Sequence, residues 1–90
     1  MALESSVEKW VDFYAKERGG RAFKLTGYTG IPDRLVLLPN GITIFVETKR
    51  PDGGIISKAQ RMVHRSLRGL GFRVFVPCTK HEVQQMFKEL

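Results

Sequence analysis

The sequence predicts a single α/β domain over residues 1–90, with elements in the order αβββαβα and a mixed four-stranded sheet flanked by helices. Three observations support this class. Ninety residues is the length of one domain. Segments with apolar residues at helical spacing are separated by β-rich runs. A hairpin is followed by a helical crossover, which suggests one mixed sheet with helices packed against it.

The chain begins with a predicted helix and a short strand. Gly19-Gly20 ends the helix. A strand is expected over residues 21–25, and residues 26–30 form a loop. The apolar face of the helix consists of Leu3, Val7, Trp10, Val11 and Tyr14.

A hairpin follows, with β-rich runs at 34–38 and 42–49 joined by Pro39-Asn40-Gly41. If these three residues form the whole loop, Gly41 takes the left-handed conformation that such loops need. Leu38 then faces Ile42, and counting along the ladder places Asp33 opposite Glu47. A two-residue loop would instead place Asp33 against Val46, so the register depends on the loop length.

The second half predicts helix, strand and helix. Ser57 to Gln60 has the form of a capping box that opens the second helix, and Gly69 and Gly71 end it. The fourth strand covers 72–76. Thr79 to Glu82 forms a second capping box. The second helix should bury Ala59, Met62, Val63, Leu67 and Leu70, and the third Val83, Met86, Phe87 and Leu90.

Charge and composition narrow the function. The net charge of +6 and the pI of about 9.9 suit a polyanionic partner, nucleic acid first and an anionic membrane second. The single Cys78 excludes an intramolecular disulfide and fits a reducing cytosol. With two histidines, a Cys/His metal site is not expected. No apolar run could span a bilayer and no signal peptide is recognisable, so we expect a cytoplasmic protein and no membrane partner.

The predicted opposition of Asp33 and Glu47 indicates a metal site. Two opposed carboxylates on one sheet face repel each other unless positive charge lies between them, and a hard divalent cation prefers such oxygen ligands. Lys49 lies two residues beyond Glu47 and therefore on the same face. A cation and an ammonium group that flank one water can lower its pKa and orient it toward phosphorus. Taken singly, these residues could be a turn residue and a solvated strand end; their alignment favours the site.

The motif Gly30-Ile31-Pro32-Asp33, followed by Glu47-Thr48-Lys49 at the end of the next strand, resembles the PD-(D/E)xK nuclease signature. More narrowly, the chain resembles the VRR-NUC domain, the virus-type replication-repair nuclease domain, whose fold has a restriction-endonuclease-like core. The similarity runs nearly end to end and includes the first-helix acid, Gly19-Gly20, the Gly-rich loop after Lys49, and Ser57 to Gln60.

The resemblance implies roles for the acidic pair and the lysine. Asp33 and Glu47 would hold Mg²⁺, for which Mn²⁺ can substitute, with the Thr48 carbonyl as a further ligand. Lys49 would position the water and neutralise developing charge.

The resemblance also implies two supporting residues. Gln60 would support the site from the start of the second helix, although as the N3 residue of the capping box it could serve only as a cap. Glu4 matches the first-helix acid of the family, an outer-sphere or second-metal ligand. Glu8 lies one turn further along nearly the same face and is the alternative.

Cationic residues recur along the second helix with no acidic residue among them. Such a row suits the phosphates of a duplex, and a solvated helix face is the alternative. Tyr28, in the preceding loop, could stack on an unpaired base or simply pack the loop. The predicted DNA-binding residues are Lys58, Arg61, Arg65 and Arg68, with Arg50 extending the row toward the site.

The sequence therefore predicts a Mg²⁺-dependent, structure-selective DNA endonuclease. The resemblance implies a homodimer of viral origin that cuts four-way (Holliday) junctions in DNA replication or repair. Two alternatives stay open: a non-catalytic nucleic-acid-binding module, and a nuclease that acts on flaps or RNA.

Overall fold

The computed structural model describes residues 4–49 and 54–90, with side chains described from Ser6 onward. The predicted element order is confirmed. The elements are α1 (Glu4–Glu17), β1 (Arg21–Lys24), β2 (Arg34–Leu38), the 3-10 turn η1 (Pro39–Gly41), β3 (Ile42–Val46), α2 (Lys58–Gly69), β4 (Arg73–Phe75) and α3 (Lys80–Lys88).

The four strands form one mixed sheet, as the sequence predicted, and the structure gives their order as β1-β2-β3-β4. β1, β2 and β3 are antiparallel neighbours, and β4 pairs with β3 in parallel. The predicted hairpin register is also confirmed, because Leu38 pairs with Ile42 and Arg34 pairs with Val46. Gly41 has a φ of +74°. The next step of this ladder would place Asp33 opposite Glu47.

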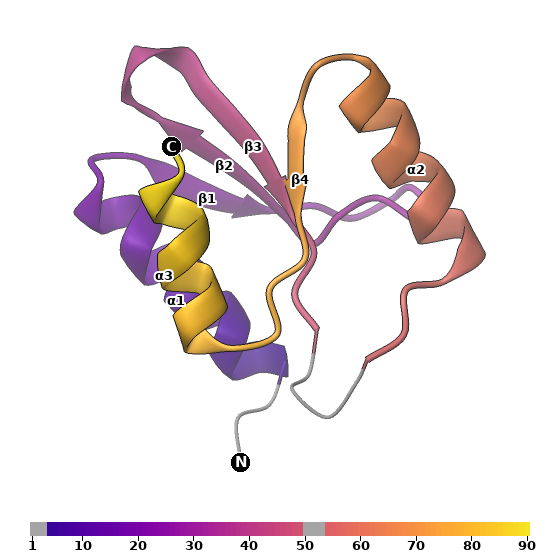
Figure 1. The fold of residues 1–90 in the computed structure, drawn as a ribbon, viewed down its shortest axis with the longest axis horizontal. Coiled ribbons are helices and arrows are strands. Elements are labelled where there is room, and N and C mark those ends of the chain that lie inside the picture. Colours follow the sequence, from indigo (N-terminus) through magenta and orange to yellow (C-terminus); the bar gives the residue numbers. More distant parts are fainter. Residues whose placement is uncertain (1–3, 50–53) are drawn as a thin grey trace.

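Helices cover the two faces of the sheet unequally (Figure 1). α1 and α3 lie side by side and pack on one face, whereas α2 stands on the other side of β4. The core lies between α1, α3 and the sheet. It consists of Val7, Val11, Ala15, Val36, Leu38, Ile44, Val46, Val83, Met86 and Phe87. In the described part of the chain, no helix is long and apolar enough to cross a membrane.

The predicted buried face of α2 is wrong in part: Ala59, Val63 and Leu67 are half-buried, but Met62 and Leu70 are exposed. Met62 and Leu70 are 61% and 74% exposed, and the fully buried residue of this helix is His64. Helical periodicity reveals an apolar face but not whether another element covers it. Here the helix turns the edge that carries Gln60 and His64 toward the sheet and leaves much of its apolar face open.

The chain stays extended beyond the end of β3. The backbone N–H of Glu47 donates to the Phe75 carbonyl at 2.8 Å, and that of Lys49 donates to the Pro77 carbonyl at 3.1 Å. These bonds continue the parallel pairing with the chain after β4. They hold the segment from Glu47 to Lys49 in a fixed, strand-like conformation.

The capping box at Ser57 is confirmed, with both reciprocal hydrogen bonds present. At α3 only half of the predicted box forms. The Thr79 hydroxyl accepts from the Glu82 N–H at 3.1 Å, but the Glu82 carboxylate accepts from the Cys78 N–H instead, at 2.8 Å. Both bonds satisfy backbone N–H donors near the start of α3, so the helix is capped although the full box does not form.

Candidate active site

Asp33 and Arg34 are neighbours in sequence but serve opposite faces of the sheet. Arg34 turns toward α1, where its Nε lies 3.1 Å from Asp12 Oδ1 and its Nη2 lies 3.4 Å from Glu8 Oε2. Strand alternation therefore directs Asp33 to the face on the α2 side. Glu8, the alternative first-helix acid, is paired with Arg34 on the far face.

The carboxylate of Asp33 is held by Thr48, which lies across the hairpin. Its Oδ2 accepts hydrogen bonds from the Thr48 N–H and from the Thr48 hydroxyl, each at 3.0 Å. Thr48 is fully buried. The sequence assigned only the Thr48 carbonyl to the site and missed this role of its hydroxyl. Among the described residues, Oδ1 of Asp33 accepts no hydrogen bond, so this oxygen is the one available to a cation.

Glu47 is buried between two basic side chains. Its side chain is 1% exposed, with Oε2 3.9 Å from Lys49 Nζ and Oε1 3.5 Å from His64 Nε2. A buried carboxylate requires neighbouring positive charge or hydrogen-bond donors to be tolerated. The structure thus brings together Glu47 and Lys49, which the sequence predicted would share a face.

His64 is a site neighbour that the sequence analysis did not identify. Burial, the main cause, lowers its pKa, and the positive charges of Arg68 and Lys49 lower it further; the Asp33 carboxylate acts in the opposite direction. The available signal for His64 was its spacing of four residues from Gln60, which puts both side chains on one helix face.

Gln60 serves both as a helix cap and as a site residue. Its side-chain oxygen Oε1 accepts from the Ser57 N–H at 2.8 Å and from Lys49 Nζ at 3.2 Å. The capping interpretation is confirmed, and the same oxygen also contacts Lys49, as a supporting role would require. The capping box fixes the Gln60 side chain, and the fixed amide oxygen in turn holds the Lys49 ammonium group beside Glu47.

The donor set fits a hard divalent cation. Two carboxylates and the Thr48 carbonyl would supply oxygen atoms, and Mg²⁺ is commonly bound by one or two carboxylates while it keeps several waters. Within residues 4–49 and 54–90, no group of three or more His, Cys, Asp or Glu side chains could hold a metal. A cation bound here would therefore take much of its coordination from water and substrate oxygens.

The other predicted site residues are the cations of α2, Arg50 and Glu4. The side chains of Lys58, Arg61, Arg65 and Arg68 are all exposed at the surface of α2. Arg61 donates to the Ile56 carbonyl at 3.0 Å and Arg68 to the Val74 carbonyl at 2.7 Å, so part of the cationic row also secures local backbone. Arg50 and the side chain of Glu4 lie outside the described residues.

Two comparisons with known proteins found similarity to nucleases. Protein-family models give no match to the chain. The chain is 44% identical over 75 residues to "Putative nuclease p44" of Acyrthosiphon pisum secondary endosymbiont phage 1, an alignment covering 81% of this chain and 80% of that protein. A solved structure described as "VRR_NUC domain" superposes with a TM-score of 0.89 at 31% identity and covers 97% of this chain and 97% of that chain. Both similarities extend over most of the molecule.

Proposed function

Because the chain belongs to the VRR-NUC nuclease family, we propose that it is a divalent-metal-dependent endonuclease that hydrolyses phosphodiester bonds in branched DNA. Membership of the family makes it a nuclease with a restriction-endonuclease-like fold. The metal, the preference for DNA and the branched substrate are the proposed part. One observation carries the proposal: Asp33, Glu47 and Lys49 converge at the end of β3, each held by a defined partner.

In this proposal, Asp33 and Glu47 hold Mg²⁺, or Mn²⁺ in its place, with the Thr48 carbonyl as a further ligand. When bound, such a cation supplies positive charge that polarises the scissile phosphate and lowers the pKa of a nearby water. The protein residues do the positioning. The Thr48 hydroxyl and N–H fix Asp33, and the buried position of Glu47 beside His64 restricts its rotamers.

Lys49 is the proposed catalytic cation. Gln60 Oε1 holds its ammonium group 3.2 Å away, which leaves further N–H donors of Nζ for other acceptors. One can donate to the attacking water and orient it, and another to a phosphate oxygen, where negative charge accumulates in the transition state. Gln60 is then a positioning residue for Lys49. Glu4 remains the proposed first-helix acid.

The proposed substrate is DNA bound through its backbone. The net charge of +6 and the exposed cations of α2 suit phosphates, which carry no sequence information. We therefore expect selection by DNA structure, with Lys58, Arg61, Arg65, Arg68 and Arg50 as the backbone contacts.

A homodimer that cuts four-way junctions would select its substrate by DNA structure in this way. One domain with one site makes one nick at a time, whereas resolving a junction takes two symmetric nicks, which a two-fold dimer supplies. The similarity to a phage protein supports a viral nuclease, and the proposed role is in DNA replication or repair in the host cytoplasm.

The substrate is tested by incubating the pure protein with labelled four-way junction, flap, duplex and single-stranded DNA, and with matched RNA, in Mg²⁺ and in EDTA. We expect paired nicks in the junction and a mass in light scattering of about twice the 10.3 kDa chain. A dimer active on flaps but not on junctions would discard the junction role and keep the nuclease. Preferential cleavage of RNA would reassign the substrate, and binding without cleavage of any substrate would favour a non-catalytic module.

A further inference from the structure

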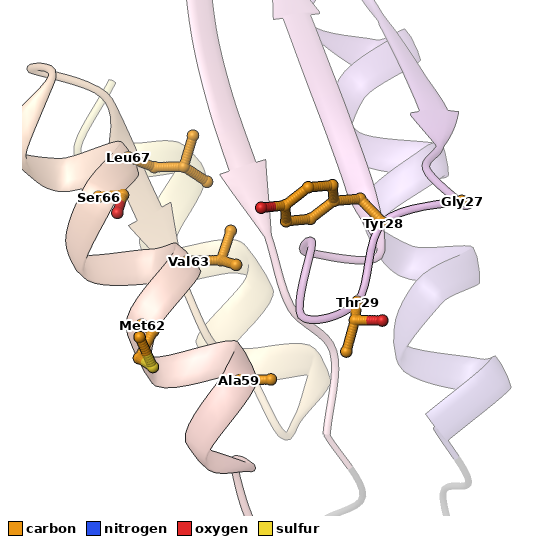
Figure 2. A pocket seen from close by; sticks show the side chains of 8 residues that line it. All are labelled: Gly27, Tyr28, Thr29, Ala59, Met62, Val63, Ser66 and Leu67. Carbon is orange, nitrogen blue, oxygen red and sulfur yellow. The ribbon is translucent and has the colours of Figure 1, made fainter.

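A groove lies between the loop at residues 27–29 and the open apolar face of α2 (Figure 2). Its volume is about 650 Å³, within the size range of small-molecule sites. Tyr28 and Thr29 form one wall, and Ala59, Met62, Val63 and Ser66 belong to the other. Most of this surface is carbon, and Thr29 and Ser66 are among its lining residues.

Tyr28 does not pack its own loop. The side chain points across the groove toward α2 in Figure 2, and the residue is 68% exposed. Its backbone carbonyl accepts from the Ile31 N–H at 3.1 Å, which closes the turn without using the ring. An aromatic face in this position is open to a flat ligand.

The two walls are fixed relative to each other by Gly30. This glycine has a φ of +90°, and a Cβ built on it would lie 2.5 Å from the Ala59 carbonyl oxygen. The loop therefore rests directly on the backbone of α2, in a conformation that a side chain would not permit. The groove exists before any ligand binds.

The groove also adjoins the candidate active site. One wall belongs to the loop that continues through Ile31 and Pro32 into Asp33. The other begins at Ala59, the residue before Gln60, which contacts Lys49. Lys58 and Arg65 are exposed on the same helix.

We propose that this groove binds one unpaired nucleobase of the DNA substrate, stacked on Tyr28, while the α2 cations hold the adjoining phosphates. The proposal rests on the nucleic-acid substrate proposed above and narrows it to DNA with unpaired or easily unstacked nucleotides near the cleavage site. Stacking on an aromatic ring tolerates any base.

The positive charge of α2 favours a nucleic acid over a second copy of the chain as the occupant of the groove. Residues 58–69 contain four Lys or Arg and no Asp or Glu. Two copies packed against each other through α2 would bring like charges together, which is unfavourable. A polynucleotide instead supplies a flat apolar base for the groove and phosphates for the cations.

The test uses a short single strand that contains 2-aminopurine, a fluorescent base that stacking quenches, and a fully paired duplex of the same length. Binding is measured by fluorescence and anisotropy in metal-free buffer, so that no cleavage occurs. We compare the wild type with Tyr28→Ala, with Tyr28→Phe, which keeps the ring, and with Phe13→Ala as a control. Phe13 is an aromatic on α1 that is 48% exposed and lies outside the groove.

Tyr28→Ala should abolish the quenching and weaken single-strand binding by about 5- to 150-fold, the range for one base–aromatic stack. Duplex binding should not change. Tyr28→Phe and Phe13→Ala should both behave as the wild type.

Three results overturn the proposal: unchanged single-strand binding by Tyr28→Ala, an equal loss on single strand and duplex, or conversion of a dimer to a monomer by Tyr28→Ala in light scattering. The last would assign the groove to a second copy. Because binding is measured without metal, a result that refutes base binding in the groove does not refute the nuclease function. If the protein cuts DNA normally but binds the single strand equally well with and without Tyr28, only the proposal about the groove is abandoned.

Discussion

Asp33 Oδ2 accepts two hydrogen bonds from Thr48, one from its N–H and one from its hydroxyl, each at 3.0 Å. Thr48 lies between Glu47 and Lys49, so one triplet supplies a carboxylate, a lysine and the clamp for the opposing aspartate. The clamp engages one oxygen of Asp33 and orients the other. A motif usually interpreted through its charged residues thus depends on the uncharged residue at its centre.

Thr48→Val tests the hydroxyl half of this clamp. Valine keeps the backbone N–H and nearly the same shape but removes the Oγ1 donor. Loss of such a supporting hydrogen bond typically lowers metal affinity or activity by about 10- to 100-fold. We expect the Mg²⁺ concentration for half-maximal cleavage to rise, and Thr48→Ser to restore it. An unchanged Mg²⁺ dependence in Thr48→Val would remove the hydroxyl from the site.

Asp33→Ala and Asp33→Asn should differ in stability without metal. Relief of carboxylate repulsion alone would stabilise both variants. The alanine variant, however, leaves the buried Thr48 N–H without its acceptor, which costs about 1–3 kcal/mol. The asparagine variant keeps an acceptor oxygen. Urea unfolding in EDTA should show Asp33→Ala to be the less stable variant. Stability of Asp33→Ala equal to or greater than that of Asp33→Asn would mean that the acceptor for the Thr48 N–H contributes little to folding.

Lys49→Ala should affect chemistry more than binding. Removing a catalytic or charge-stabilising group typically lowers the rate by about two to four orders of magnitude. The single-turnover cleavage rate at saturating protein measures this directly. DNA affinity in metal-free buffer should change little, because one phosphate contact is a small part of the electrostatic total. Weak binding with normal cleavage at saturation would reverse the assignment.

Lys58→Ala combined with Arg65→Ala should weaken binding to all DNA sequences alike. Among the described residues, neither side chain makes a hydrogen bond or an ion pair, so the fold should tolerate both changes. The slope of log affinity against log salt should fall by about one unit per lost phosphate contact. Lys16→Ala with Lys88→Ala removes the same charge from the ends of α1 and α3. Equal effects of the two pairs would reduce the row on α2 to a general charge effect.

The hairpin was the most predictable part of the molecule. Its loop length fixed the register from Leu38 opposite Ile42 to Arg34 opposite Val46, because every further pair follows by counting. The helix starts were also predictable, since Ser57 and Thr79 cap their helices through local hydrogen bonds. Such features depend on residues a few positions apart, and sequence patterns report them well.

Tertiary contacts were not predictable in the same way. His64 looked like an ordinary helix residue, and only the docking of α2 brings it to Glu47. The open face with Met62 and Leu70 has the same periodicity as a buried one. The Thr48 hydroxyl was missed because the family resemblance directs attention to the charged residues. In each case the sequence pattern did not show which surfaces of the elements pack against each other in the fold.

The central claim is that Asp33 and Glu47 hold a catalytic divalent cation, and cleavage of a labelled four-way junction tests it most directly. Wild type, Asp33→Asn, Glu47→Gln and the surface control Glu17→Gln are compared in Mg²⁺ and in EDTA, after circular dichroism has shown that all are folded. We predict cleavage by the wild type and the control in Mg²⁺ only, and none by Asp33→Asn or Glu47→Gln. Cleavage that persists in EDTA, or in either site variant at a rate near wild type, would contradict the account.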